Sequence, residues 1–133
     1  MRVSFSFLTN LTASSALPYT LLGIGLARLA GARMRTVSGI TLAHGGRLPR
    51  WLAAHPLGAM SAITLGNVVL ARDDAALHGT LAHELAHVRQ FHAWGVLFPL
   101  AYSAASVWSL LRGRGLYWGN AFEVAARAAE KQR

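Results

Sequence analysis

The strongest chemical signal in the chain is a pair of histidines in the segment His83-Glu84-Leu85-Ala86-His87. On an α-helix this spacing puts both imidazoles on one face, about 6 Å apart along the axis, so that they can converge on one metal ion. Glu84 is rotated about 100° from His83 and cannot easily join as a ligand. It can reach a water molecule at the open position of a zinc ion, which acidifies that water. The segment therefore predicts a zinc site with Glu84 as general base.

The same five-residue pattern also occurs by chance in unrelated helices. The alternative interpretation is two histidines on a polar helix face with a surface glutamate between them. Leu81, Leu85 and Val88 indicate instead that this helix is largely buried. Buried polar groups need partners, so the pattern favours the metal site.

A third protein ligand is needed, and the chain has only five acidic residues. Asp73 and Asp74 come more than two helical turns before the first histidine, which is too far along the axis to reach the same ion. The remaining candidates are Glu123, which we favour, and Glu130. Glu123 also follows Asn120 at the spacing of a capping box, and the two roles are compatible.

The other histidines are weaker candidates for the third ligand. A metzincin site needs glycine and histidine three and six residues after His87, where this chain has Gln90 and Ala93. His92 is rotated away from the ligand face of the helix. Three more histidines are expected at the surface or behind the ligands: His44, His55 and His78.

Three segments together resemble small gluzincin-type zinc metallopeptidases. They are the segment LAHELAHVRQ at Leu81–Gln90, the dipeptide Trp94-Gly95, and the segment NAFE at Asn120–Glu123. The family usually has proline where this chain has Ala121, a difference that loosens the start of the last helix but keeps the carboxylate. The resemblance covers roughly Ile63–Ala129.

This resemblance implies His83, His87 and Glu123 as zinc ligands and Glu84 as the catalytic base. It also implies that the strand before the metal helix is a sheet edge that aligns a peptide substrate. The first 60 residues add nothing to the resemblance.

Peptidases of this kind usually donate a hydrogen bond to the tetrahedral oxyanion. The candidates are Tyr102, Tyr117 and His92, and we favour Tyr117 because it is close in sequence to the expected ligand Glu123. The alternative for Tyr117 is an aromatic residue of the core or of an interface. Two further residues are expected either to support the ligands or to face solvent: Arg89 and Gln90.

The pattern of apolar, glycine and proline residues predicts an α+β fold. It is a mostly helical, minimal zincin-like single domain over residues 1–133, with a small β-sheet before the metal helix. The expected helices are Pro18–Ala32, a helix from Asp73-Asp74 to Trp94 that ends at Gly95, Phe98–Leu111, and Ala121–Gln132 capped by Asn120. The expected strands are Arg35–Leu42, before a turn at Gly45-Gly46, and Ala62–Leu70, which Gly66-Asn67 interrupts as a bulge or tight turn. The segment Leu48–Ala54 is expected to be one helical turn or a loop.

Composition restricts the possible chemistry and the possible partners. The chain has no cysteine, which excludes disulfides, cysteine–zinc sites, iron–sulfur clusters and a cysteine nucleophile. Thirteen basic and five acidic residues leave a net charge of +8, which suits an anionic partner such as a lipid surface or serves solubility alone. Nucleic acid is disfavoured, because the arginines are scattered and no recognition motif is present.

Three long stretches carry no charged residue: Val3–Ala27, Trp51–Ala71 and Gln90–Leu111. Within the last, Trp94–Leu111 is at the lower length limit for crossing a bilayer, and a buried hairpin helix or an interfacial helix explains it equally well. We interpret the N-terminal stretch as a helix of the mature protein, with a signal peptide as the alternative. The expected location is therefore cytoplasmic or membrane-associated.

The expected function is a Zn2+-dependent metallopeptidase that acts on a peptide or protein substrate. The alternative is a catalytically weak or inactive zinc-binding module that associates with an anionic membrane surface or a partner protein. Glu84 argues against a purely structural site, which has no need of a base and usually has four closed ligands.

Overall fold

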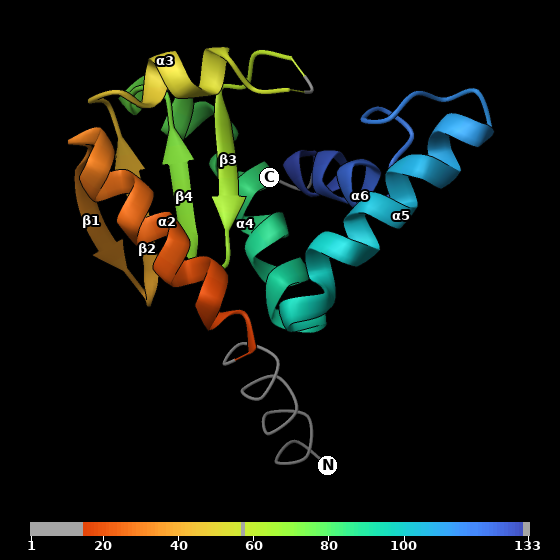
Figure 1. The fold of residues 1–133 in the computed structure, drawn as a ribbon, viewed down its shortest axis with the longest axis horizontal. Coiled ribbons are helices and arrows are strands. Elements are labelled where there is room, and N and C mark those ends of the chain that lie inside the picture. Colours follow the sequence, from red (N-terminus) through yellow and green to blue (C-terminus); the bar gives the residue numbers. More distant parts are fainter. Residues whose placement is uncertain (1–14, 57, 132–133) are drawn as a thin grey trace.

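The computed structural model describes residues 15–56 and 58–131 and confirms the predicted α+β class (Figure 1). The predicted N-terminal helix up to residue 14 and the end of the last predicted helix at Gln132 lie outside these residues. Helices of several lengths surround one small mixed sheet. The elements are α2 (Leu17–Ala30), β1 (Arg33–Val37), β2 (Ile40–His44), α3 (Leu48–Ala53), β3 (Ala62–Leu65), β4 (Val68–Ala71), α4 (Asp74–Trp94), the 3₁₀ turn η1 (Gly95–Leu97), α5 (Phe98–Leu111) and α6 (Ala121–Glu130).

The sheet has the strand order β1-β2-β4-β3. Its outer pairs, β1 with β2 and β3 with β4, are antiparallel, and the central pair of β2 and β4 is parallel. Strand β3 is therefore an edge strand. Among the described residues its only strand partner is β4, so its other edge is open.

Each of the two segments predicted as one strand forms a β-hairpin of two strands. The single strand expected at Arg35–Leu42 is wrong, because the chain reverses at Ser38-Gly39, where both residues have left-handed φ angles of 51° and 80°. Around Gly66-Asn67 the tight-turn alternative is confirmed. Gly66 has a φ of 60°, and an added Cβ there would lie 2.3 Å from the Thr20 hydroxyl oxygen, so only glycine fits.

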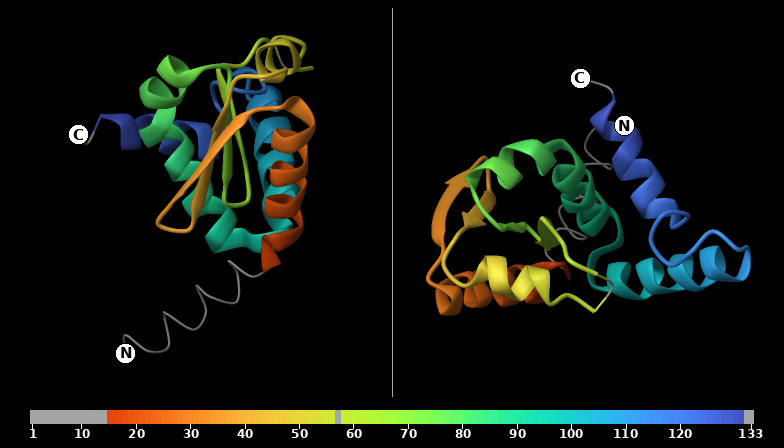
Figure 2. Two further views of the ribbon diagram at one scale, coloured as in Figure 1. Left: turned by 90° about the vertical axis from the view of Figure 1, so that its left-hand side faces the viewer. Right: turned by 90° about the horizontal axis from the view of Figure 1, so that it is seen from above.

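Strand β4 and the middle of β2, Leu42 and Ala43, are buried on both faces, because helices cover each side of the sheet. Alternate side chains of the two strands meet α2 and α3 on one face, and the intervening ones meet α4 on the other. Figure 2 shows α2 and α4 on opposite sides of the sheet. The first set is Ala43, Val68 and Leu70, and the second is Leu42, Val69 and Ala71.

Helix α4 has the predicted bounds. The Asp73 carboxylate accepts a hydrogen bond of 2.7 Å from the Ala76 amide, and Asp74 lies in the first turn, where the helix dipole favours a negative charge. The helix ends at Gly95, whose φ of 60° turns the chain through η1 into α5. The expected helix at Phe98–Leu111 is also confirmed, and the segment Leu48–Ala53 is helical rather than a loop.

Aromatic packing holds α5 and α6 against the C-terminal half of α4. The Phe98 ring centroid lies 4.5 Å from that of Phe91 and 5.1 Å from that of Phe122, both at steep angles. Such edge-to-face pairs each contribute roughly 0.5–1.5 kcal/mol beyond the area they bury. One ring from each of the three helices thus fixes their relative positions.

Asn120 is fully buried and begins α6 at a defined place on α5. Its Oδ1 caps the helix by accepting a hydrogen bond of 2.9 Å from the Phe122 amide. Its Nδ2 donates to the Tyr102 carbonyl at 3.0 Å and to the Ser106 hydroxyl at 2.8 Å. This junction directs the first turn of α6, which carries Glu123, toward α4.

Candidate metal centre

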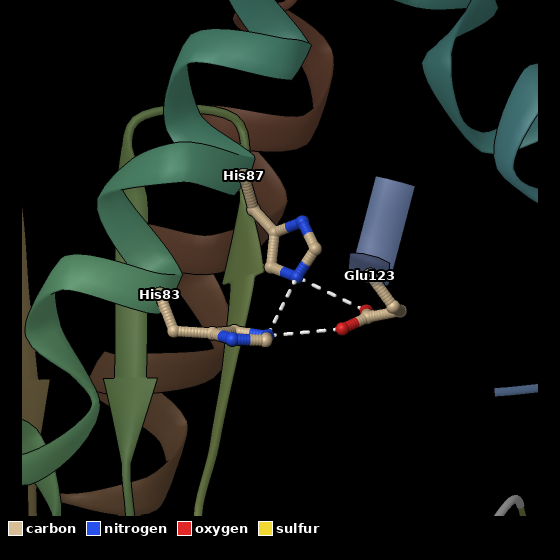
Figure 3. Close-up of side chains that lie close together, drawn as sticks. All are labelled: His83, His87 and Glu123. Atoms are coloured by element: carbon tan, nitrogen blue, oxygen red, sulfur yellow. Dashed lines mark hydrogen bonds and ion pairs between the residues drawn. The ribbon is translucent and has the colours of Figure 1, made fainter. Parts of the chain in front are cut away.

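Three side chains from two helices converge at one point: His83 and His87 of α4 and Glu123 of α6 (Figure 3). The two Nε2 atoms lie 3.2 Å apart. Glu123 places one carboxylate oxygen 2.9 Å from Nε2 of His83 and the other 3.0 Å from Nε2 of His87. In a tetrahedral zinc site with bonds of about 2.0–2.1 Å, ligand atoms are roughly 3.3 Å apart. The three groups are therefore close to the spacing of a shared metal ion.

Hydrogen bonds behind the two rings decide which nitrogen carries the proton. Nδ1 of His83 lies 2.6 Å from the Glu130 carboxylate, which can only accept when ionised, so Nδ1 donates. The Gln90 side-chain amide donates to the Phe122 carbonyl at 3.0 Å, which turns its oxygen toward Nδ1 of His87 at 2.8 Å. Nδ1 of His87 therefore donates as well. In the neutral form both rings present the lone pair of Nε2 to the shared point.

The cluster consequently directs two nitrogen lone pairs and a carboxylate at one buried point. All three side chains are buried. Three acceptors at such distances repel one another unless a cation lies between them. Two imidazole nitrogens and a carboxylate form a donor set that suits zinc, with a fourth position left open. The three residues could therefore hold a metal ion, and zinc stays the prediction for its identity.

The pKa values of the cluster residues reflect the same need for positive charge. The hydrogen bond with Glu123 raises the pKa of His83. Burial disfavours the charged form of His87, but the hydrogen bond and charge of Glu123 outweigh it and raise that pKa too. Burial favours a neutral Glu123, yet the hydrogen bonds from His83 and His87 hold the pKa of its carboxyl far below the usual range. Glu123 thus favours positive charge at both imidazoles, which a proton or a metal ion can supply.

Glu84 lies beside the cluster and points toward the edge strand. Its side chain is buried, and its Oε2 accepts a hydrogen bond of 2.6 Å from the Thr64 hydroxyl of β3. Burial raises the pKa of Glu84, and the Thr64 hydroxyl opposes the shift. The Glu84 carboxylate is therefore held between α4 and β3 and is more basic than an exposed glutamate.

A cavity of about 380 Å³ opens at the cluster. Its walls come from β3, α4 and α5 and from the segment before α6, and the metal cluster and Glu84 both line it. A second hollow adjoins it and shares His83, Glu84 and Tyr117. A few polar groups within mostly apolar walls are typical of a ligand site. The apolar contributions include Ile63, Leu65, Phe91 and Phe98.

Of the three oxyanion candidates, the structure brings two to this cavity. The Tyr102 hydroxyl donates to Glu123 at 2.8 Å, and burial raises its pKa far above the usual range. Burial and then the charge of Glu123 raise the pKa of Tyr117 to about 12. Both phenols stay neutral and can donate a hydrogen bond. His92 is not brought to the cavity, because its ring contacts the Asn67 side chain at the tip of the β3–β4 hairpin.

The remaining predicted residues have defined places. Asp73 and Asp74 lie at the start of α4, away from the cluster, as expected. Nε2 of His44 lies 3.8 Å from Oδ1 of Asp74, and Nδ1 of His78 lies 3.5 Å from Oδ2 of the same carboxylate. Arg89 is exposed, in keeping with its solvent alternative. His55, expected at the surface or behind the ligands, is half-buried and lines the cavity.

Glu130 has a function that the sequence reasoning missed. The sequence predicts it only as a weaker alternative ligand, whereas its carboxylate contacts the outer nitrogen, Nδ1, of His83. A signal was available, because Glu123 and Glu130 are seven residues apart and therefore lie on one face of a helix. Gln90 supports His87, which is one of the two roles expected for it.

Comparison of the chain with protein-family models, with curated proteins and with solved structures gave no match.

Proposed function

We propose that the protein is a zinc-dependent metallopeptidase that hydrolyses peptide bonds. The observation that carries this proposal is the convergence of His83, His87 and Glu123 on one buried point, with the Glu84 carboxylate beside it at an open strand edge. A structural zinc site would need neither the open fourth position nor the adjacent base.

The metal cluster, Glu84 and Tyr117 have distinct tasks in this reaction. A zinc ion held by His83, His87 and Glu123 would supply a Lewis acid and an acidified water molecule. Glu84 accepts the proton of the attacking water and passes it to the leaving amine, and its burial makes it a stronger base. Tyr117, a neutral phenol at the cavity wall, donates a hydrogen bond to the oxyanion as negative charge develops.

The open edge of β3 supports a peptide as the substrate. An edge strand offers unpaired backbone N–H and C=O groups, to which an extended chain can add as a further strand. The cavity runs along Ala62–Leu65, so a chain bound there passes directly in front of Glu84. The apolar walls suit hydrophobic side chains on either side of the cleaved bond.

Zinc content measured by plasma mass spectrometry after extensive dialysis tests the metal site. We expect about one zinc per native chain and loss of most of it in Glu123→Ala. Val124→Ala changes an exposed residue of the same helix and should keep the full zinc content. Absence of zinc from the native chain after incubation with the metal would reject the proposal.

Cleavage of a diverse peptide library tests catalysis, with Glu84→Gln as the matched variant. We expect this variant to bind zinc normally and to cleave about 10²–10⁴-fold more slowly than the native chain, because it lacks the base. A native chain that binds zinc but cleaves no peptide would point instead to the zinc-binding module. Equal cleavage by Glu84→Gln and the native chain would assign the base to another residue.

A further inference from the structure

The outer face of α5 is apolar although it faces solvent. Its exposed side chains span about 160° of the helix, at 100° per residue. Helices of water-soluble proteins normally turn a polar face outward. The exposed residues are Leu100, Ser103, Ala104, Val107, Trp108, Leu110 and Leu111, of which Leu100 is 70% and Leu111 is 75% exposed.

The inner face of the same helix builds the metal centre. Phe98, Tyr102, Ser106 and Ser109 are the more buried side chains, and Tyr102 donates to the ligand Glu123. Helix α5 therefore cannot turn its apolar face inward without dismantling the site. An exposed apolar face of this kind indicates a binding partner that shields it from water.

The apolar surface extends beyond α5. The turn that leads into it exposes Trp94, Val96 and Leu97, and α2 exposes four leucines along its outer face. Both views of Figure 2 show α2 and α5 along the same side of the molecule. The α2 leucines are Leu17, Leu21, Leu22 and Leu29.

This side of the molecule is also positively charged. Every charged residue in α2, α3 and α5, or directly flanking α3 and α5, is an arginine: Arg28, Arg47, Arg50 and Arg112. The five acidic residues of the chain all lie in α4 and α6 or next to them, and two of them are buried in the metal centre. The partner of this side must therefore be apolar in part and negatively charged.

The helical run Asp74–Leu111 is long and apolar enough to cross a membrane by length and composition alone. The run bends at Gly95, however, and its first part carries the buried metal cluster. Helix α5 by itself has 14 residues, or about 21 Å, against roughly 30 Å for a bilayer core. Its length thus suits a position in the plane of the interface.

We propose that the side formed by α2, α3 and α5 docks on the surface of an anionic phospholipid bilayer. The apolar face of α5 inserts at the level of the headgroups, and the arginines contact the lipid phosphates. Trp108 of α5 is exposed, and tryptophan is enriched at membrane interfaces. This docking goes beyond the proposed peptidase function and holds whether or not the chain cleaves peptides.

Vesicle flotation with the full chain tests the docking. We compare vesicles of phosphatidylcholine alone with vesicles that contain 30% phosphatidylglycerol. The variant Val107→Glu/Leu111→Glu puts two negative charges on the outer face of α5. The control Val37→Glu/Val124→Glu adds the same two negative charges at exposed valines of β1 and α6.

We expect the native chain and the control to bind the anionic vesicles and the α5 variant to bind at least tenfold less. Binding to neutral vesicles should be weaker, and the far-UV circular dichroism spectra of all three chains should be equal, which shows that the fold is kept. Equal binding by the α5 variant and the control overturns the proposal. So does a lipid-free native dimer that the α5 variant alone dissociates, because a second copy would then cover α5.

Discussion

Glu130 accepts a hydrogen bond of 2.6 Å from Nδ1 of His83, while Nε2 of the same ring faces Glu123. Two carboxylates on one face of α6 therefore contact opposite nitrogens of one imidazole. The outer carboxylate sets the tautomer and the direction of the ring, and the inner one completes the metal cluster. A carboxylate behind a metal-binding histidine also raises the basicity of that histidine.

We predict that Glu130→Ala weakens zinc binding about 10–100-fold without removing the site, because His83 keeps its place in α4 but loses the partner that orients it. Glu130→Gln keeps an acceptor oxygen and should lose less. Competition with a chelator of known affinity measures both. Equal affinities of Glu130→Ala and the native chain would show that α4 alone orients the ring.

The two tyrosines at the cavity should have separable effects. Tyr117→Phe is predicted to lower kcat by about 10²–10³-fold, with a smaller effect on zinc affinity than Tyr102→Phe, because it removes a donor to the oxyanion. Tyr102→Phe removes the hydrogen bond to Glu123 and should weaken zinc binding instead. Steady-state kinetics and chelator competition on both variants check this. The opposite pattern would exchange the roles of Tyr102 and Tyr117.

The stability of the chelated protein should depend on pH through the cluster. The folded protein raises the pKa values of His83 and His87, so their stabilising contribution is complete below the usual histidine pKa and is lost as pH rises through the raised values. The pKa of Glu123 is depressed, so its contribution is present above the usual carboxyl pKa and is lost only in strong acid.

We therefore expect the Tm of the chelated protein to fall from weakly acidic to alkaline pH. The Tm of the zinc-loaded protein should change less over this range, because the metal replaces the protons. The gap between the two Tm values widens as pH rises. Thermal melts with and without chelator measure this gap. A gap that is constant with pH would contradict the raised pKa values of His83 and His87.

Asn120→Ala is predicted to lower the free energy of unfolding by about 2–4 kcal/mol. The change removes the cap of α6 and leaves the buried Ser106 hydroxyl and the Tyr102 carbonyl without their partner. Urea unfolding in the presence of chelator measures this loss apart from the metal. Asn120→Asp keeps the capping oxygen and should lose less, and equal losses would show that the cap is unimportant.

The sequence by itself determined the local features of this protein. Helix α4, its Asp73 cap and its end at Gly95 follow from short-range rules of capping and backbone conformation, and so does the common face of His83 and His87. The small number of acidic residues also narrowed the third ligand to Glu123 or Glu130. Apart from this count, these inferences need only the neighbours of each residue along the chain.

Only the tertiary structure decided how distant segments meet. The sheet order that leaves β3 at the edge depends on the pairing of β2 with β4, which no local pattern encodes. The choice between Glu123 and Glu130 depends on how α6 packs against α4 and α5. The contacts between phenylalanine rings of these three helices, together with the hydrogen bonds of Asn120, determine that packing. Such contacts join residues far apart in sequence, so their geometry appears only when the whole core is packed.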